Sequence, residues 1–169
     1  MNLNINATAF LSTFYSLRDG HVRYEIGQGL GKVRRLSNAP SSVTGLDCSG
    51  FVQYMIFRST NPNVRIPAGS WYQERYFRDN GYVEVPYADH AWKNDDVVRI
   101  GFRDRTDDLI RHVWFVINGF TYESTTRSGR DGPTCFHWSA RTDQADNFYV
   151  VGPATDFLWA ELSGSVRAA

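Results

Sequence analysis

The sequence is poor in cysteine and methionine, with two of each among 169 residues, and its 18 basic and 18 acidic side chains cancel. Two cysteines in a chain of this length do not form a disulfide framework. The four histidines are isolated from one another, and no spacing of cysteine and histidine resembles a zinc site. A balanced charge disfavours a large nucleic-acid footprint, and no apolar run approaches the length of a membrane span. We therefore expect no metal site, no nucleic-acid partner and no membrane insertion.

The opening segment, "MNLNINATAFLSTF", has neither a positively charged start nor a long apolar core. It does not match a secretory signal. We therefore expect the protein to be synthesised in the cytoplasm without a signal peptide. The length suits a single domain over residues 1–169.

Helical patterns come first along the chain, and strand-like patterns follow. The apolar spacing predicts one helix from Asn6 to Leu17 and a second that opens at Asp47, and Ser70 is a candidate cap for a third over "WYQERYFRD". Runs rich in β-branched and aromatic residues predict strands at 96–102, 112–117 and 147–152. This order predicts an α+β fold with a mostly antiparallel sheet.

The segment "RHVWFVINGFTYEST" predicts a β-hairpin, because an Asn-Gly pair between two strand-like runs favours a type I′ turn. With Asn118 and Gly119 as the turn residues, side chains alternate between two faces. His112 and Glu123 then become diagonal neighbours on one face, where a carboxylate can orient an imidazole. The alternative is a histidine at the edge of the core and a solvated glutamate. The wholly apolar face comprises Val113, Phe115, Ile117, Phe120 and Tyr122.

Cys48 lies in "GLDCSGFVQYMIF" at the predicted start of the second helix. There the helix dipole and free backbone N–H groups favour a thiolate, and a backbone N–H can serve an oxyanion. Ser49 and Gly50 are small, which lets a substrate approach the sulfur. A nucleophilic cysteine needs a histidine from elsewhere in the chain, and His112 on its strand is the natural candidate. The alternative is a small buried thiol.

These segments together resemble the NlpC-type cell-wall cysteine peptidases, a papain-like superfamily. "DCSGFVQ" is similar to the nucleophile motif of the family, and "RHVWFVINGFTYEST" to its histidine strand and the strand that follows. Weaker similarities to segments of the family occur in "VRYEIGQG", "IPAGSWYQ" and "NDDVVRIGF". The resemblance spans roughly Tyr24 to Thr125 and implies a papain-like fold, with the nucleophile at the N-terminus of a helix packed on a mostly antiparallel sheet.

The resemblance implies roles for individual residues. Cys48 takes the position of the nucleophile, His112 that of the general base, and Glu123 the third polar position, where the family more often has His, Asn or Gln. His137 is a rival for that third position. The supporting residues are Tyr24, Asp47 and Ser49, and the candidate groove residues are Trp71, Tyr72 and Trp114. Trp114 replaces a small residue of the family pattern, and Ala68 stands where an arginine is common.

The implied activity is hydrolysis of amide bonds in the peptide stems of peptidoglycan, next to D-γ-glutamyl or diaminopimelate residues, without a metal or organic cofactor. Without a signal peptide, three settings stay open: an interbacterial amidase effector similar to the type VI kind, a phage lysin, and a cytoplasmic recycling peptidase. An effector acts in the periplasm after non-classical delivery and implies a cognate immunity protein. Two other classes stay open. One is an acyltransferase, amidase or thioesterase on a non-wall substrate, and the other is a non-catalytic module with Trp71, Tyr72, Trp92 and Trp138 as its aromatic surface.

Overall fold

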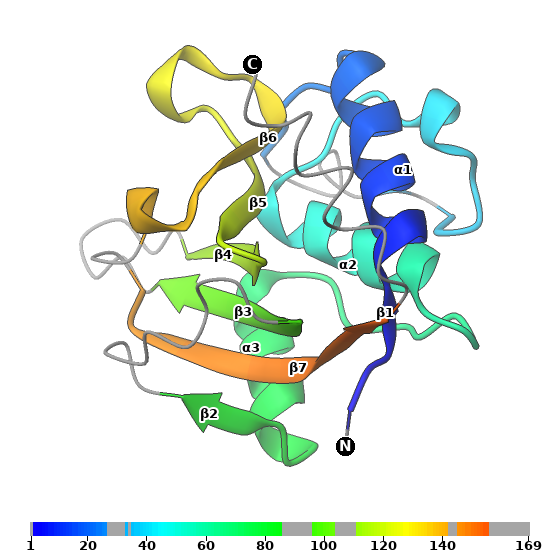
Figure 1. Cartoon of the computed structure of the whole chain (residues 1–169). Coiled ribbons are helices and arrows are strands. Elements are labelled where there is room, and N and C mark those ends of the chain that lie inside the picture. The colour runs from blue at the N-terminus through cyan, green and yellow to red at the C-terminus, as the bar shows by residue number, and fades with distance from the viewer. Residues whose placement is uncertain are drawn as a thin grey trace.

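The computed structural model describes residues 2–26, 33, 35–85, 96–103, 111–141 and 145–155, and Figure 1 shows how the elements are arranged. The α-helices of this part are α1 (Ala7–Asp19), α2 (Cys48–Ser59) and α3 (Ser70–Asp79). The strands are β1 (Ile5–Asn6), β2 (Val83–Val85), β3 (Val97–Arg103), β4 (His112–Ile117), β5 (Phe120–Thr125), β6 (Gly132–His137) and β7 (Asn147–Thr155). Short 3₁₀ turns occupy η1 (Pro40–Ser42), η3 (Arg127–Gly129) and η4 (Trp138–Ala140).

The strands form one sheet in the order β1-β7-β3-β4-β5-β6, and β2 pairs with β7 beside this path. All described pairings are antiparallel except the short one between β1 and β7. The prediction of an α+β fold with a mostly antiparallel sheet is therefore confirmed. The predicted strands at 96–102, 112–117 and 147–152 correspond to β3, β4 and β7.

The first two helices begin where the sequence predicts. The side chain of Asn6 accepts from the N–H of Ala9 at 2.7 Å and caps α1, and Asp47 caps α2 in the same way. α1 and α2 pack side by side on one face of the sheet (Figure 1). The third helix covers the predicted residues, but the prediction of Ser70 as its cap is wrong. The cap is Gly69, whose φ of 89° no other residue adopts readily, and Ser70 is the first helical residue.

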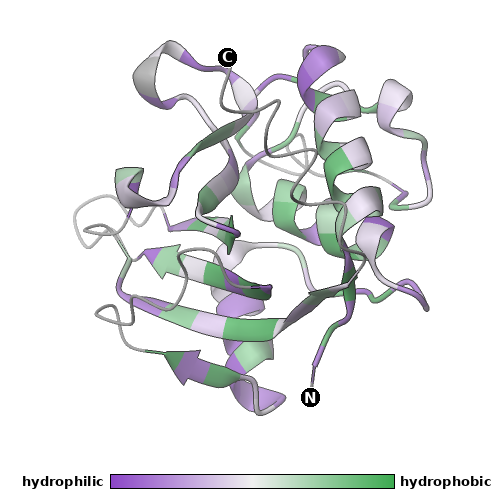
Figure 2. Ribbon diagram, in the orientation of Figure 1, coloured by the Kyte–Doolittle hydropathy of each residue, from purple (hydrophilic) through white to green (hydrophobic). Residues whose placement is uncertain are grey.

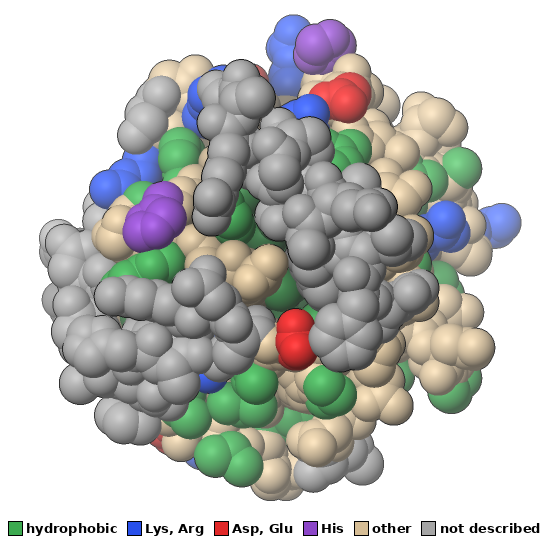
Figure 3. Space-filling model, viewed as in Figure 1, with side chains coloured by type: hydrophobic (Ala, Val, Ile, Leu, Met, Phe, Trp, Pro, Cys, Tyr) green, Lys and Arg blue, Asp and Glu red, His purple; other side chains and the backbone are tan. Residues whose placement is uncertain are grey.

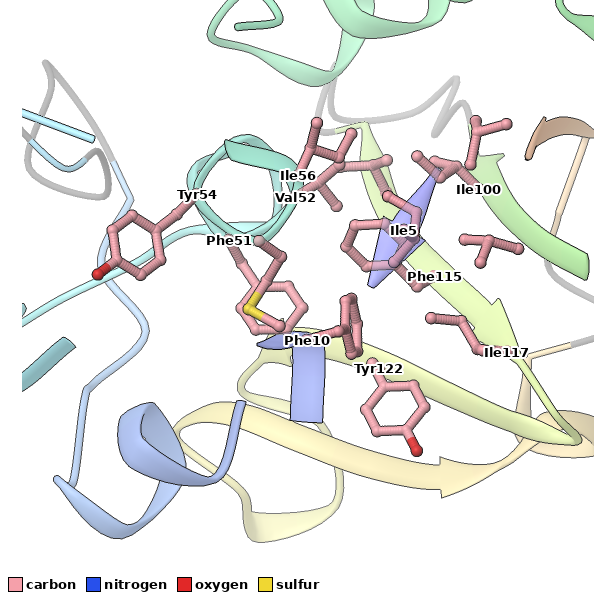
Figure 4. Close-up of a cluster of buried hydrophobic side chains, with 14 of the residues drawn as sticks. Ile5, Phe10, Phe51, Val52, Tyr54, Ile56, Ile100, Phe115, Ile117 and Tyr122 are labelled. Carbon is pink, nitrogen blue, oxygen red and sulfur yellow. The ribbon is translucent and has the colours of Figure 1, made fainter. Parts of the chain in front are cut away.

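The core lies between α1, α2 and the apolar face of the sheet. Figure 4 shows the rings of Phe10, Phe51, Phe115 and Tyr122 gathered there. Phe10 meets Phe115 edge to face with ring centroids 5.1 Å apart. All four are nearly or fully buried, and each buried aromatic side chain contributes roughly 1.5–3 kcal/mol from burial alone. Figure 2 shows the same apolar layer as green ribbon where the helices face the sheet.

The second face of the sheet is closed as well. Trp114, Val116 and Phe148 form a separate buried cluster there, against which Trp138 packs. Gly101 makes room for this cluster. It lies opposite Trp114 in the register, and a Cβ at its position would come within 2.6 Å of the Phe148 ring and 2.7 Å of the indole. Side chains on this face are therefore held in a closed environment rather than in water.

Charged side chains are dispersed over the exterior. On the face shown in Figure 3, those of the described residues lie singly or in small groups, with apolar side chains between them. Among the described residues, no helix combines the length and apolar character that crossing a bilayer requires.

We expect Gly101→Ala to destabilise the fold by roughly 1–3 kcal/mol, because the added methyl overpacks the cluster around Trp114. Urea unfolding measures this loss. In a Trp114→Leu background one of the two close ring contacts of the methyl is removed and that with Phe148 remains, so the same substitution should cost less. An equal loss in both backgrounds would contradict the assignment of the contact.

Candidate active site

Cys48 is the first residue of α2, and the residues beside it form the helix cap. The carboxylate of Asp47 accepts from the N–H of Gly50 at 2.6 Å and from the hydroxyl of Ser49 at 2.9 Å. These bonds satisfy donors of the first helical turn that have no partner within the helix. Asp47 and Ser49, expected as supporting residues, therefore fix the start of the helix that carries the thiol.

The segment before Cys48 is tied to two distant parts of the chain. The N–H of Leu46 donates to the carbonyl of Arg23 at 2.9 Å. The hydroxyl of Ser124, on β5, donates to the carbonyl of Leu46 at 2.7 Å. These bonds place the N-terminus of α2 against the strand that carries Glu123 and against the segment that carries Tyr24.

His112 and Glu123 meet as the hairpin predicts. The ladder pairs Phe115 with Tyr122 and Ile117 with Phe120, and Asn118 and Gly119 have the positive φ values, 46° and 79°, that a type I′ turn requires. The register prediction is confirmed over these pairs. His112 Nε2 lies 2.5 Å from Glu123 Oε2. Glu123 has no exposed surface, so the alternative of a solvated glutamate is wrong.

Cys48 approaches the same imidazole. Its sulfur lies 3.8 Å from the carbonyl oxygen of Arg111, the residue before His112, and its side chain is near enough to act on the pKa of His112. Because Nε2 is held by Glu123, Nδ1 is the ring nitrogen left for the sulfur. Burial lowers the pKa of His112, but the hydrogen bonds and charges of Cys48 and Glu123 outweigh it and raise that pKa to about 9. His112 therefore carries its proton at neutral pH and can pair with a thiolate.

Glu123 is held by a residue that the sequence patterns did not single out. Arg141, just after η4, donates from Nε to Glu123 Oε1 at 2.9 Å and from Nη2 to Oε2 at 2.6 Å. Burial raises the pKa of the Glu123 carboxyl, but the bonds and charges of His112 and Arg141 bring it below its usual value. Glu123 is thus an ionised carboxylate without contact with water.

Tyr24 lies beside Cys48, where the family resemblance puts it. Its phenol is near enough to Cys48 for that residue to act on its pKa, and its own N–H donates to Asp131 Oδ1 at 2.9 Å. Burial, followed by the nearby negative charges of Cys48 and Asp47, raises the pKa of the phenol above its usual value. Tyr24 therefore stays protonated and can donate a hydrogen bond at the sulfur.

The remaining predicted residues lie in three different places. Trp71 and Tyr72 are 44% and 59% exposed on the first turn of α3. Trp114 is fully buried, so its prediction as a groove residue is wrong: it stacks on the His112 ring, with centroids 5.6 Å apart.

His137 is exposed at the end of β6, with Nδ1 2.7 Å from the Ser139 hydroxyl, whereas Glu123 is the residue against His112. Trp92 lies outside the described residues.

Helix α3 links both halves of the site. Gln73 donates to the carbonyl of Ser49 at 2.8 Å, next to the thiol. Glu74 accepts from Arg111 at 2.9 Å, just before His112, and from Asn147 at 2.8 Å. The exposed pair Trp71 and Tyr72 thus belongs to the helix that is bonded to the segments of Cys48 and of His112.

The second cysteine has a different environment. Cys135, on β6, lines a cavity of about 780 Å³ together with Arg23 and Asp131, and neither Cys48 nor His112 lines that cavity. Burial raises the pKa of the Cys135 thiol to about 12. It therefore stays a neutral thiol. Among the described residues, no three His, Cys, Asp or Glu side chains are grouped to hold a metal ion.

Comparison with known proteins gives a likeness to solved structures alone. No family model matches the chain, and no curated protein matches it. Among solved structures it is similar to the P60 domain of the antigen MAP1204 from M. avium subspecies paratuberculosis, with a TM-score of 0.49 and 20% identity over 85% of this chain and 93% of that one. The chemistry is therefore argued from the site itself.

We expect His112 to titrate near pH 9 in NMR spectra, and Glu123→Gln to lower its pKa, because the amide removes the anionic partner of the imidazolium. The folded-state pKa lies above the ordinary 6.5, so the folded state binds the proton more tightly. His112 therefore stabilises the fold fully below about pH 6.5, and this contribution is lost as the pH rises through about 9. An ordinary pKa for His112 in the wild type would contradict the proposed contacts.

Proposed function

We propose that the protein is a cysteine hydrolase that cleaves amide bonds in peptidoglycan stem peptides through an acyl-enzyme on Cys48. The observation that supports this chemistry is the imidazole of His112, which lies 2.5 Å from the Glu123 carboxylate and near enough to the Cys48 side chain for that side chain to raise its pKa. A thiol beside a histidine that is oriented by a third polar group is the arrangement for nucleophilic acyl transfer. His112 acts as acid and base, and Glu123 orients it.

The first step is attack of the Cys48 thiolate on the carbonyl carbon of the amide. A carbon–sulfur bond forms and the carbonyl becomes an oxyanion. The Cys48 N–H at the N-terminus of α2 and the protonated hydroxyl of Tyr24 are the donors beside it. The imidazolium of His112 gives its proton to the amide nitrogen, the carbon–nitrogen bond breaks, and the amine leaves.

The second step removes the acyl group from the sulfur. Neutral His112 takes a proton from water, and the oxygen of that water attacks the thioester carbon. The carbon–sulfur bond breaks, the acid product leaves, and the proton on His112 restores the ion pair with the thiolate. Glu123 stabilises the imidazolium in both steps and takes no proton.

The substrate class and the papain-like fold are proposed from the likeness of "DCSGFVQ" and the histidine strand to NlpC-type peptidases. An acyltransferase, amidase or thioesterase acting elsewhere would use the same three residues, so only products separate these alternatives. Trp71 and Tyr72 are proposed as groove residues, because they are exposed and their helix is bonded to the thiol segment through Gln73. They would serve equally in a non-catalytic module, which requires no reactive thiol.

We expect the purified protein to release stem-peptide fragments from peptidoglycan, and Cys48→Ala to abolish release, because the nucleophile is gone. Liquid chromatography and mass spectrometry of the muropeptides identify the bond. Cys135→Ser is the matched control and should retain activity, since Cys135 lies outside the site. Equal cleavage by the wild type and Cys48→Ala would contradict the mechanism. No cleavage by a protein whose Cys48 reacts rapidly with iodoacetamide would favour a non-wall substrate.

The biological setting is proposed as an interbacterial effector, with action in the periplasm after non-classical delivery and an immunity protein that covers the cleft at Cys48. Phage lysis and cytoplasmic recycling are the alternatives. We expect wild-type protein directed to the periplasm of a Gram-negative host to lyse the cells, and Cys48→Ala to leave them intact. Lysis by both proteins, or by neither, would refute the effector proposal.

A further inference from the structure

We propose that Arg141 is a positioning residue for the Cys48–His112 pair and acts through the carboxylate of Glu123. This assignment rests on the function proposed above, because it gives Arg141 a part in that chemistry. Arg141 donates hydrogen bonds to both carboxylate oxygens of Glu123, with Nε 2.9 Å from Oε1 and Nη2 2.6 Å from Oε2. The same Oε2 lies 2.5 Å from Nε2 of His112. Two side chains from separate segments, those of His112 and Arg141, thus converge on one carboxylate.

The guanidinium is committed to the protein rather than to a ligand. The side chain of Arg141 is 8% exposed and that of Glu123 is not exposed at all. Beyond the two bonds to Glu123, Nη2 lies 3.4 Å from the hydroxyl of Thr125, and the guanidinium carbon lies 5.9 Å from the centre of the Trp114 ring. A group enclosed in this way does not reach a substrate, so any effect on the reaction passes through Glu123.

The two bonds fix the orientation of the carboxylate. Turning Glu123 would break two charge-assisted hydrogen bonds at once, so Oε2 stays aimed at Nε2 of His112. An ionised Oε2 accepts the proton on Nε2 and leaves Nδ1 for the sulfur of Cys48. A buried carboxylate without a cation tends to take a proton itself, and as an acid it no longer favours this arrangement of the ring. Arg141 therefore sets both the direction and the charge of Glu123.

The direct action of Arg141 on His112 is unfavourable. Its Nη2 lies 3.5 Å from Nε2, and a cation this close disfavours an imidazolium. Arg103, opposite His112 on β3, carries the same sign. The benefit of Arg141 must therefore come from the carboxylate that it holds. Among the described residues, the titratable and charged groups around the imidazole are Cys48 from α2, Arg103, Arg111, Glu123 and Arg141, and Tyr24 lies beside Cys48.

The test is a double-mutant cycle on Arg141 and Glu123, measured without peptidoglycan. The variants are Arg141→Met, Arg141→Lys, Glu123→Gln and Arg141→Met combined with Glu123→Gln. The readouts are the rate of iodoacetamide alkylation of Cys48, resolved from Cys135 by peptide mass spectrometry, and the hydrogen-bonded ring N–H proton of His112 in NMR spectra of histidine-labelled protein. Circular dichroism and urea unfolding identify variants that fold.

The matched control is Arg127→Met. Arg127 belongs to the same part of the chain and donates to the carbonyl of Ala140 at 2.6 Å, immediately before Arg141, without a bond to Glu123. Substituting Arg127 removes an arginine that anchors this segment, whereas the bonds from Arg141 to the carboxylate of Glu123 remain. We expect Arg127→Met to lower the urea midpoint while alkylation of Cys48 and the His112 N–H signal stay as in the wild type.

We expect Arg141→Met to slow alkylation of Cys48 roughly tenfold or more, the size expected from losing hydrogen bonds to a charged group. The downfield His112 N–H signal should be lost, and Arg141→Lys should restore part of both. In the Glu123→Gln background, Arg141→Met should have little further effect, because the group through which it acts is already altered. A purely structural ion pair would couple the two residues in stability without changing thiol reactivity.

An unchanged alkylation rate of Cys48 in a folded Arg141→Met protein would overturn the assignment. So would a double variant whose rate falls by the product of the two single-variant factors. If Arg141→Met does not fold, Arg141→Lys decides: rapid alkylation with the N–H signal intact would overturn it, and partial loss of both would support it. The proposed function fails separately. If Arg141 and Glu123 are coupled in the alkylation of Cys48 but no muropeptide is released, Arg141 keeps its role and the wall substrate is wrong. If muropeptides are released without such coupling, the wall substrate stands and the role of Arg141 is wrong.

Discussion

The site depends on one buried charge, the carboxylate of Glu123. A carboxylate with no exposed surface is costly unless hydrogen bonds and opposite charges compensate for the lost water. Here His112 supplies one bond and Arg141 supplies two. Strand β4, strand β5 and the segment after η4 must therefore come together at one place, and this requirement fixes the imidazole that faces Cys48.

The closed second face of the sheet strengthens these interactions. Trp114 is fully buried and stacks on the His112 ring, and the absence of a side chain at Gly101 makes room for the indole. Hydrogen bonds and ion pairs act more strongly where the local dielectric constant is low. The face that a simple alternation of polar and apolar residues assigns to solvent is therefore the one that holds the charged site.

Local chemistry made half of the site predictable from the sequence. The start of α2 follows from Asp47, whose carboxylate caps the helix within three residues of itself. The pairing of His112 with Glu123 follows from Asn118 and Gly119, because a two-residue turn sets the register of the strands on both sides. Strand β6 gave no such signal: it starts with Gly-Pro, and its pairing with β5 is set by a longer connection.

Arg141 was not predicted, because its position depends on the path of the chain beyond β6 rather than on its neighbours in sequence. The need for such a residue does follow from the hairpin. Glu123 lies on a closed face beside a histidine that, in the proposed mechanism, carries a positive charge in one step and none in the next. The histidine alone then cannot compensate the carboxylate throughout the proposed reaction. A permanent cation is required, and an arginine meets that requirement best, because its planar fork matches both carboxylate oxygens and it never loses its proton. Which residue supplies the cation is set by the fold, whereas the need for a cation follows from the burial of Glu123.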